Sequence, residues 1–184
     1  MKQDHRVRLT KMLLREAFLD LLLEKPVAKI TVKELCNKAG VNRATFYAHY
    51  RDLFDLHEEI EQDLAHTIMH SLNTTQPGNL FSAFSTAICS IIVEHQRSCQ
   101  AIFGEFGDPD FPLRVVETLR ESSLALWHEE RPEVPKDELN RFYTFAANGC
   151  LAVVRAWVQN DMQESPETIA RFIEKMTTKG LTSL

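Results

Sequence analysis

The segment from Ile30 to Tyr50 has the pattern of two short helices joined by a tight turn. Thr31 can cap the first helix, and Glu34 follows at the spacing of a capping box. Apolar residues then recur at positions i, i+3, i+4 and i+7: Val32, Leu35, Cys36 and Ala39. This spacing predicts a helix with one apolar stripe, which must pack against another element.

The turn and the second helix follow directly. Gly40 can leave the first helix through a left-handed conformation. Asn42 can cap a second helix that we expect from Arg43 to His49. Two helices joined in this way form a helix-turn-helix, a motif whose second helix can enter the major groove of DNA.

The composition is that of an ordinary globular protein. The chain has 184 residues, of which 44% are hydrophobic and 26% charged. No apolar run reaches the roughly 18 residues of a membrane span, and the N-terminus has no secretory signal pattern. We therefore expect a cytoplasmic location and no association with a membrane.

The charges are segregated along the chain. Residues 1–51 hold 11 Lys and Arg against 5 Asp and Glu, whereas residues 52–184 hold 10 against 21. A basic first third on an acidic remainder is typical of a protein whose first part meets a polyanion. Charge alone leaves open an unevenly charged solvated surface, and the helix-turn-helix pattern favours the polyanion.

The sequence gives no support for an enzyme, a metal or a cofactor. The four cysteines are widely separated and lie in apolar helical patterns, which favours buried reduced thiols over a redox role. The seven histidines show no ligand spacing. The sequence shows no recognisable pairing of a nucleophile with a base and no recognisable set of metal ligands.

Helical periodicity predicts an all-α fold of about nine helices. Besides the two helices of the opening motif, we expect helices at Val7–Lys25, Leu53–Leu72, Leu80–Glu94, Ser98–Phe106, Leu113–Glu130, Asp137–Asn160 and Pro166–Lys179. The organisation is then an N-terminal three-helix helix-turn-helix domain at residues 1–52, followed by a larger helical domain at residues 53–184.

The helix expected from Asp137 to Asn160 is apolar around most of its circumference, so it must be covered on more than one side. Two readings remain: burial inside one chain, or burial partly against a second copy. For the second reading the predicted interface residues are Ala146, Gly149, Val153, Trp157, Ile169, Phe172 and Ile173.

The run Ala39-Gly40-Val41-x-Arg43-x-Thr45-Phe46-Tyr47-x-His49-Tyr50 resembles the TetR family of bacterial transcriptional regulators. The resemblance is closest across residues 10–60. It implies that residues around the second helix contact DNA, and these are Thr31, Asn42, Arg43, Ala44, Thr45, Tyr47, His49 and Arg51. It also implies an all-helical ligand-binding and dimerisation domain in the rest of the chain.

The resemblance divides these residues by role. Thr31, Thr45, Tyr47 and His49 match phosphate contacts, which fix register without reading sequence. Asn42, Arg43 and Ala44 match the positions nearest the base edges. Arg43 is the best candidate for direct readout, because its guanidinium suits guanine O6 and N7.

Other roles remain open for several residues. Phe46 and Tyr50 are better read as core than as DNA contacts. Tyr47 has a second reading as a packing residue, and Arg43 as a phosphate contact only. The family often has a lysine where this chain has Leu53, so one phosphate contact is in doubt, and Arg51 is placed to supply the charge instead.

The family mechanism implies a homodimer on a near-palindromic double-stranded operator, with recognition helices in successive major grooves. We expect a repressor that responds to an apolar or aromatic small molecule. The residues predicted to line its site are Phe84, Ile88, Phe103, Leu119, Ser123, Trp127, Phe142 and Phe145. The alternative function is a helical co-regulator or activator that acts mainly through protein partners.

Overall fold

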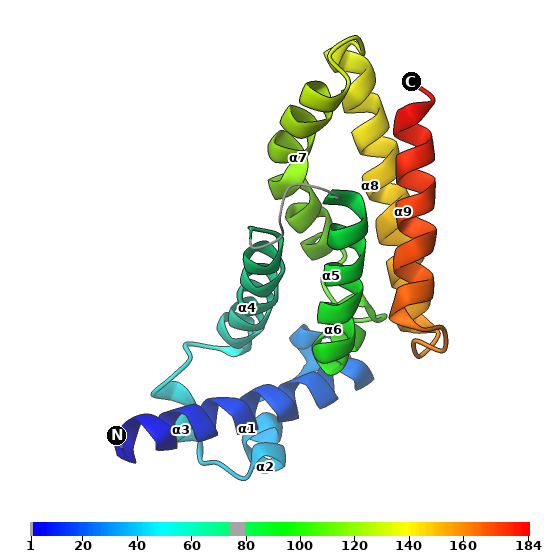
Figure 1. Cartoon of the computed structure of the whole chain (residues 1–184). Helices are drawn as coiled ribbons and strands as arrows, with labels where there is room; N and C mark the ends of the chain where they lie inside the picture. Colours follow the sequence, from blue (N-terminus) through cyan, green and yellow to red (C-terminus); the bar gives the residue numbers. More distant parts are fainter. Residues whose placement is uncertain (1, 74–79) are drawn as a thin grey trace. The chain divides into compact units, whose positions relative to one another are not determined.

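The computed structural model describes the backbone of residues 2–73 and 80–184, and the side chains of residues 5–71 and 85–184. Over this part of the chain it contains nine α-helices and one 3-10 helix but no strand, which confirms the all-α prediction (Figure 1). The elements are α1 (Lys2–Glu24), η1 (Val27–Lys29), α2 (Val32–Ala39), α3 (Arg43–Tyr47), α4 (Leu53–Asn73), α5 (Leu80–Glu94), α6 (Gln96–Phe103), α7 (Phe111–Glu130), α8 (Lys136–Gln159) and α9 (Pro166–Thr182).

Most helix ends lie close to the predicted ones, and two differences affect the recognition motif. The sequence pattern did not reveal η1, which follows directly after Pro26. Helix α3 ends at Tyr47 instead of His49, because the next amides turn back on Phe46: His49 N and Tyr50 N both donate to its carbonyl oxygen at 2.9 Å. The second helix of the helix-turn-helix is therefore a single short helix followed by a tight turn.

The chain packs as two compact units. Unit 1 comprises residues 1–66 and 97–108, and unit 2 comprises residues 67–96 and 109–184. Helix α4 contributes to both units, and most of α6 belongs to unit 1. The domain boundary expected after residue 52 stays a prediction.

In unit 1, α1 lies across the helix-turn-helix and packs against α2 (Figure 1). Leu14 and Phe18 of α1, Leu35 of α2, Phe46 of α3 and Leu56 of α4 are fully buried. These side chains come from each of the first four α-helices, so one apolar core fixes the helices of the motif together.

In unit 2, α9 packs along α5 and beside α8, and α7 packs against α8 (Figure 1). One cluster of buried side chains consists of Trp127, Val134, Leu139, Phe142, Tyr143 and Leu181. Gly180 allows the close approach of α8 to α9, because a Cβ atom there would lie 2.6 Å from Phe142 Cε2. The Tyr143 hydroxyl donates to the Val116 carbonyl oxygen at 2.6 Å and ties α8 to α7.

None of the helices, as far as the chain is described, is long and apolar enough to cross a membrane. Among the described residues, no three His, Cys, Asp or Glu side chains gather in a way that could hold a metal ion.

Candidate nucleic-acid interface

The start of α2 is capped by Thr31, as its sequence position predicts. The Glu34 amide donates to Thr31 Oγ1 at 3.2 Å. The Glu34 carboxylate accepts a hydrogen bond from Lys25 Nζ at 2.5 Å, which ties the end of α1 to the first turn of α2. The Thr31 side chain is exposed at this helix start, where backbone amides attract anions.

The turn between α2 and α3 depends on Gly40. Its φ of 67° and ψ of 28° place it in the left-handed region, which a glycine enters without steric cost. Val41 N then donates to the Cys36 carbonyl oxygen at 3.0 Å and closes the end of α2. This local geometry sets the direction in which α3 leaves the turn.

Asn42 caps α3, and the cap involves Thr45 twice. Asn42 Oδ1 accepts hydrogen bonds from Thr45 N at 2.7 Å and from Thr45 Oγ1 at 2.9 Å. The Thr45 hydroxyl, for which the resemblance implies a phosphate contact, thus donates within the protein in this structure. The Asn42 amide nitrogen lies at the exposed start of the helix with its two donors.

Helix α3 has one buried and one exposed side. Phe46 is completely buried and Tyr50 is 3% exposed, which confirms their assignment to the core. Arg43 and Ala44 are exposed, and Tyr47 is 58% exposed with its ring edge-on to Phe46 at 5.3 Å between ring centroids. Of the side chains of α3 predicted to meet DNA, Arg43, Ala44 and Tyr47 are therefore exposed, whereas Thr45 is half-buried.

The segment that leads from α3 into α4 carries the remaining predicted contacts. His49 is half-buried, and Leu53 is 6% exposed and forms part of the core. Arg51 has 81% of its side chain exposed. Its Nη2 donates to Asp55 Oδ1 at 3.0 Å, and its backbone N donates to Asp55 Oδ2 at 2.8 Å. Asp55 thus holds Arg51 in place at the surface.

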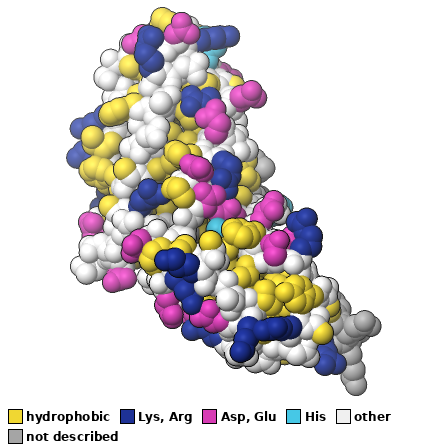
Figure 2. Space-filling model, turned by 180° about the vertical axis from the view of Figure 1, so that it is seen from behind, with side chains coloured by type: hydrophobic (Ala, Val, Ile, Leu, Met, Phe, Trp, Pro, Cys, Tyr) yellow, Lys and Arg dark blue, Asp and Glu magenta, His cyan; other side chains and the backbone are white. Residues whose placement is uncertain are grey.

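Many of the cations in the basic first third of the chain are engaged in ion pairs. On the face drawn in Figure 2, several Lys and Arg side chains lie beside Asp and Glu side chains. The pairs that Lys and Arg form in unit 1 are Lys11 with Glu59, Arg15 with Asp63, Lys25 with Glu34, Lys38 with Asp20 and Glu24, Arg51 with Asp55, and Arg97 with Glu16 and Asp20. Arg43 and Lys33 have exposed side chains and no ion-pair partner in the part of the chain that the structure describes.

Lys33 is a candidate contact that was absent from the predicted set. It is exposed in the first turn of α2, two residues after the exposed cap Thr31. Its position beside a predicted phosphate contact was visible in the sequence. Like Lys29 of η1, it is exposed and has no ion pair in the described part of the chain, and a sequence pattern cannot supply that information.

Three carboxyl groups of unit 1 have lowered pKa values. Hydrogen bonds from Lys25 and Arg51 hold the pKa of Glu34 and of Asp55 below their ordinary values. Burial opposes the shift at Glu59, but hydrogen bonds from Lys11 and Tyr50 still lower its pKa. All three groups are therefore more readily ionised in the folded chain than in the unfolded one.

We expect acid to destabilise unit 1. A lowered folded-state pKa contributes stability above the unfolded value, which is 4.5 for glutamate, and this contribution is lost as the pH falls through the folded value. The urea concentration at half-unfolding, followed by circular dichroism, should fall as the pH drops from neutral to about 3. Glu59→Gln should show a shallower fall, and an unchanged midpoint over this range in the wild type would contradict the expectation.

The residues predicted to line an effector site are divided among several environments. Phe84 lies outside the described side chains, and Phe103 is buried in unit 1. In unit 2, Trp127 and Phe142 pack together at 5.1 Å between ring centroids, while Phe145 is 78% exposed. The other three also lie in unit 2: buried Leu119, and half-buried Ile88 and Ser123.

The residues predicted for a dimer interface also differ in exposure. Gly149 of α8 and Phe172 of α9 are exposed, and Ala146 and Val153 are half-buried. Trp157, Ile169 and Ile173 are buried within the chain itself. Trp157 Nε1 also donates to the Glu164 carbonyl oxygen at 2.9 Å and fixes the connection between the two helices.

Comparison with known proteins relates the chain to transcriptional regulators. Residues 80–179 match the TetR-type family model of a transcriptional regulator C-terminal region. The HTH-type transcriptional regulator YxbF of Bacillus subtilis strain 168 is 38% identical over 80 residues, which cover 43% of this chain and 21% of that relative. This chain therefore spans about a fifth of the length of that relative.

Two solved structures share the fold over nearly their whole length. A TetR transcriptional regulator from Streptococcus agalactiae 2603V superposes with a TM-score of 0.68 at 24% identity, covering 96% of this chain and 98% of that one. NalD of Pseudomonas aeruginosa, the secondary repressor of the MexAB-OprM multidrug efflux pump, gives 0.69 at 15% identity, covering 98% of both chains. At these identities the likeness establishes the fold, and the family model covers more than half of the chain.

Proposed function

The chain belongs to the TetR family of transcriptional regulators, and we propose that it is a ligand-responsive repressor that binds a near-palindromic operator as a homodimer. Regulators of this family are not enzymes, and membership implies DNA binding and dimerisation in general. One observation carries the proposal furthest: α3 buries Phe46 and exposes Arg43, Ala44 and Tyr47 on its open face.

In this proposal α3 lies in the major groove with its N-terminal residues at the base edges. Arg43 reads a guanine, because its exposed guanidinium has no ion-pair partner in the described residues and five donors in a fixed fork. Ala44 contacts a thymine methyl. Asn42 uses its side-chain oxygen for the cap, so its amide nitrogen can donate to a base edge. Tyr47 donates its exposed hydroxyl to a phosphate.

The phosphate contacts extend to both sides of α3. On one side, Thr31 and Lys33 stand at the exposed start of α2. On the other, Arg51 supplies the positive charge that the family often takes from a lysine at the position of Leu53. Leu53 is buried here, whereas Arg51 is exposed and held by Asp55. In this chain the positive charge therefore lies two residues earlier than the lysine of other family members, and the mode of binding is unchanged.

Arg43→Ala tests the reading of DNA. We expect the ratio of operator affinity to nonspecific affinity to fall about 10- to 100-fold, because a good bidentate contact contributes ~1–3 kcal/mol of discrimination against the wrong base. The operator is obtained by selecting duplexes from a random pool with the wild-type protein, and affinities are measured by fluorescence anisotropy at one salt concentration.

Tyr47→Phe is the matched control on the same face of α3. Removal of its hydroxyl should weaken binding to every duplex by a similar factor, since a phosphate contact carries no sequence information. Equal operator selectivity in Arg43→Ala and the wild type would refute the assigned role of Arg43. Absence of any selected duplex with the wild type would instead favour a co-regulator or activator that works through protein partners.

The proposed dimer interface is the exposed face of α8 and α9. Phe145 is 78% exposed, Phe172 50% and Met176 57%, so these two helices present large apolar side chains that the chain itself does not cover. Gly149 lies on α8, one turn beyond Phe145, and a Cβ atom there would have nothing within 4 Å in the chain itself. A second copy can therefore approach α8 closely at this position and cover the aromatic rings.

The effector remains a prediction. A mainly apolar or aromatic molecule is the class that suits the predicted lining, within which Trp127 and Phe142 already pack on each other. In the proposal its binding in the larger domain alters the separation of the two recognition helices, through a coupling of ~1–3 kcal/mol between the sites. A protein that controls transcription in this way works in the bacterial cytoplasm.

A further inference from the structure

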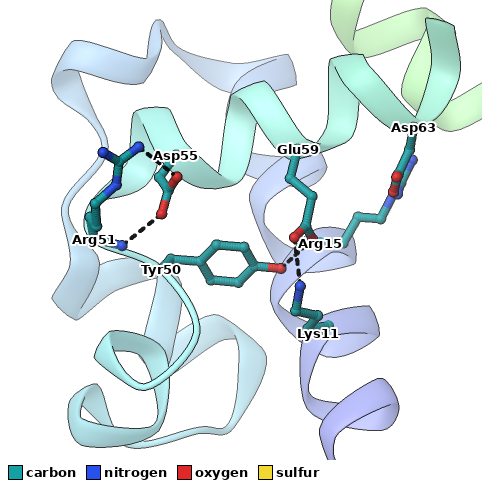
Figure 3. Close-up of polar contacts among 7 residues, drawn as sticks. All are labelled: Lys11, Arg15, Tyr50, Arg51, Asp55, Glu59 and Asp63. Carbon is teal, nitrogen blue, oxygen red and sulfur yellow. Dashed lines mark hydrogen bonds and ion pairs between the residues drawn. The ribbon is translucent and has the colours of Figure 1, made fainter. Parts of the chain in front are cut away.

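Two carboxylates of α4 hold the chain segment that leaves α3 (Figure 3): Asp55 accepts from the Arg51 amide, and Glu59 binds Tyr50. The Tyr50 hydroxyl donates to Glu59 Oε1 at 2.7 Å. Lys11 Nζ of α1 donates to the other oxygen, Glu59 Oε2, at 2.5 Å. The same ammonium group lies 5.3 Å from the centroid of the Tyr50 ring. Glu59 of α4 therefore binds the segment that follows α3 through one carboxylate oxygen and α1 through the other.

From this geometry we infer that Glu59 is a positioning residue of the recognition helix, which acts through Tyr50 and fixes the direction in which Arg43 and Tyr47 point. The inference rests on the proposed function, namely that α3 reads DNA. It goes beyond that function because it assigns sequence selectivity partly to a side chain that does not touch DNA.

Helix α3 needs such a support because it is very short. It has only 5 residues, from Arg43 to Tyr47, and a helix of this length has little stability of its own. Its orientation is set by what it packs against. Phe46 anchors its middle in the core, and the Tyr50 ring packs against Phe46 at 5.7 Å between ring centroids. A shift of Tyr50 would therefore move the end of α3 as well.

Neighbouring carboxylates of α4 make contacts of a different kind. Asp55, Glu59 and Asp63 follow one another at intervals of four residues, so they share one face of the helix (Figure 3). Asp55 accepts from the Arg51 amide and pairs with its highly exposed guanidinium, and Asp63, itself 57% exposed, pairs with Arg15 at 2.7 Å. Exposed pairs of this kind contribute little to stability. Glu59, in contrast, binds the hydroxyl of a side chain that is only 3% exposed.

The protonation states favour a firm contact. Burial and the hydrogen bond to Glu59 raise the pKa of Tyr50, so its hydroxyl keeps the proton that it donates. Hydrogen bonds from Lys11 and Tyr50 lower the pKa of Glu59 against the opposing effect of burial, so the carboxylate is ionised at neutral pH. Both contacts are then charge-assisted hydrogen bonds, which are shorter and stronger than neutral ones.

Glu59→Gln tests the inference with little change of shape. The amide has one oxygen that accepts and one nitrogen that only donates, whereas Tyr50 and Lys11 are both donors to separate atoms. If Lys11 keeps the oxygen, the Tyr50 hydroxyl must reverse and accept from the nitrogen, and neither contact is then made to a carboxylate. We expect the ratio of operator affinity to nonspecific affinity to fall about tenfold, which is the scale of one weakened base contact.

Asp63→Asn is the matched control. It removes the same charge one helical turn further along α4, at the pair with Arg15. If negative charge alone mattered, both variants would bind every duplex slightly more tightly, because each removes a charge that repels phosphates. We expect this small gain for Asp63→Asn with unchanged selectivity, and a loss of selectivity for Glu59→Gln.

Tyr50→Phe keeps the test decisive if Glu59→Gln folds poorly. It removes only the hydroxyl, and it should lower selectivity to a similar extent. Because the two side chains act through one contact, the double variant should lose no more than either single variant. Circular dichroism at the assay temperature checks that each variant is folded. A lower selectivity can then be distinguished from a loss of stability.

The outcomes separate this inference from the proposed function. Wild-type selectivity in folded Glu59→Gln and Tyr50→Phe would overturn the positioning role and leave the proposed function standing. The same loss of selectivity in Asp63→Asn would also overturn it, because charge would then be the cause. A wild-type protein that selects no duplex at all would remove the proposed function, and the inference with it.

Discussion

Replacement of Phe145 and Phe172 by aspartate is expected to convert the proposed dimer into a monomer and to weaken operator binding by at least about 100-fold. Both side chains are half-exposed or more in the single chain, so the charges cost the monomer little. In a dimer they would be buried without a partner, which is strongly unfavourable. A single helix-turn-helix would then meet one half-site only, and the avidity of two linked contacts would be lost.

Sedimentation velocity and operator titration of the same samples measure the two effects. Val93→Asp and Leu113→Asp are matched controls, because they place a charge at exposed apolar positions of unit 2 outside α8 and α9. Both controls should remain dimeric and bind the operator as the wild type does. A double variant Phe145→Asp, Phe172→Asp that stays dimeric would place the interface elsewhere.

The second large effect is expected at Phe46. Its side chain is completely buried between the helices of unit 1, and truncation of such a phenylalanine to alanine costs about 3–5 kcal/mol in the free energy of unfolding. That loss is a large fraction of the 5–15 kcal/mol by which typical domains are stable. We expect Phe46→Ala to leave α3 poorly ordered and operator binding lost at temperatures where the wild type is active.

Native-state hydrogen exchange of the α2 amides reports the free energy of opening of this part of the chain. Tyr47→Ala is the matched control, since it removes an aromatic side chain at the next position of the same helix where 58% of it is exposed. It should cost less than about 1 kcal/mol in the same measurement, in line with other exposed positions. Similar losses for both variants would show that burial of Phe46 does not hold α3 in place.

The local features of the recognition motif could be predicted from the sequence because they depend on neighbours in the chain. Thr31, Gly40 and Asn42 each act on backbone groups a few residues away, and the structure contains all three of these contacts. Such short-range hydrogen bonds and turns are determined by residue type and spacing. The fold class follows from helical periodicity for the same reason.

Contacts between distant segments could not be predicted in this way. Lys11 and Glu59 are 48 residues apart, and no spacing rule connects them. Several of the ion pairs in unit 1 also join residues far apart in the sequence. The excess of basic residues in the first third therefore overstates the number of cations that are available to DNA. Phe145 shows a related limit: periodicity places it on a helix with apolar residues all round, but it does not tell which side the chain itself covers.

The ion pairs within unit 1 affect how many copies of the protein a cell would need to regulate transcription. Nonspecific affinity for DNA depends on how many cations are available to phosphates, and here the carboxylates of α1, α2 and α4 already engage Lys11, Arg15, Lys25 and Lys38. With few available cations, a smaller fraction of the protein would be bound to nonspecific sites on the chromosome. More of it would then be available to the operator, and a low copy number per cell would suffice for regulation.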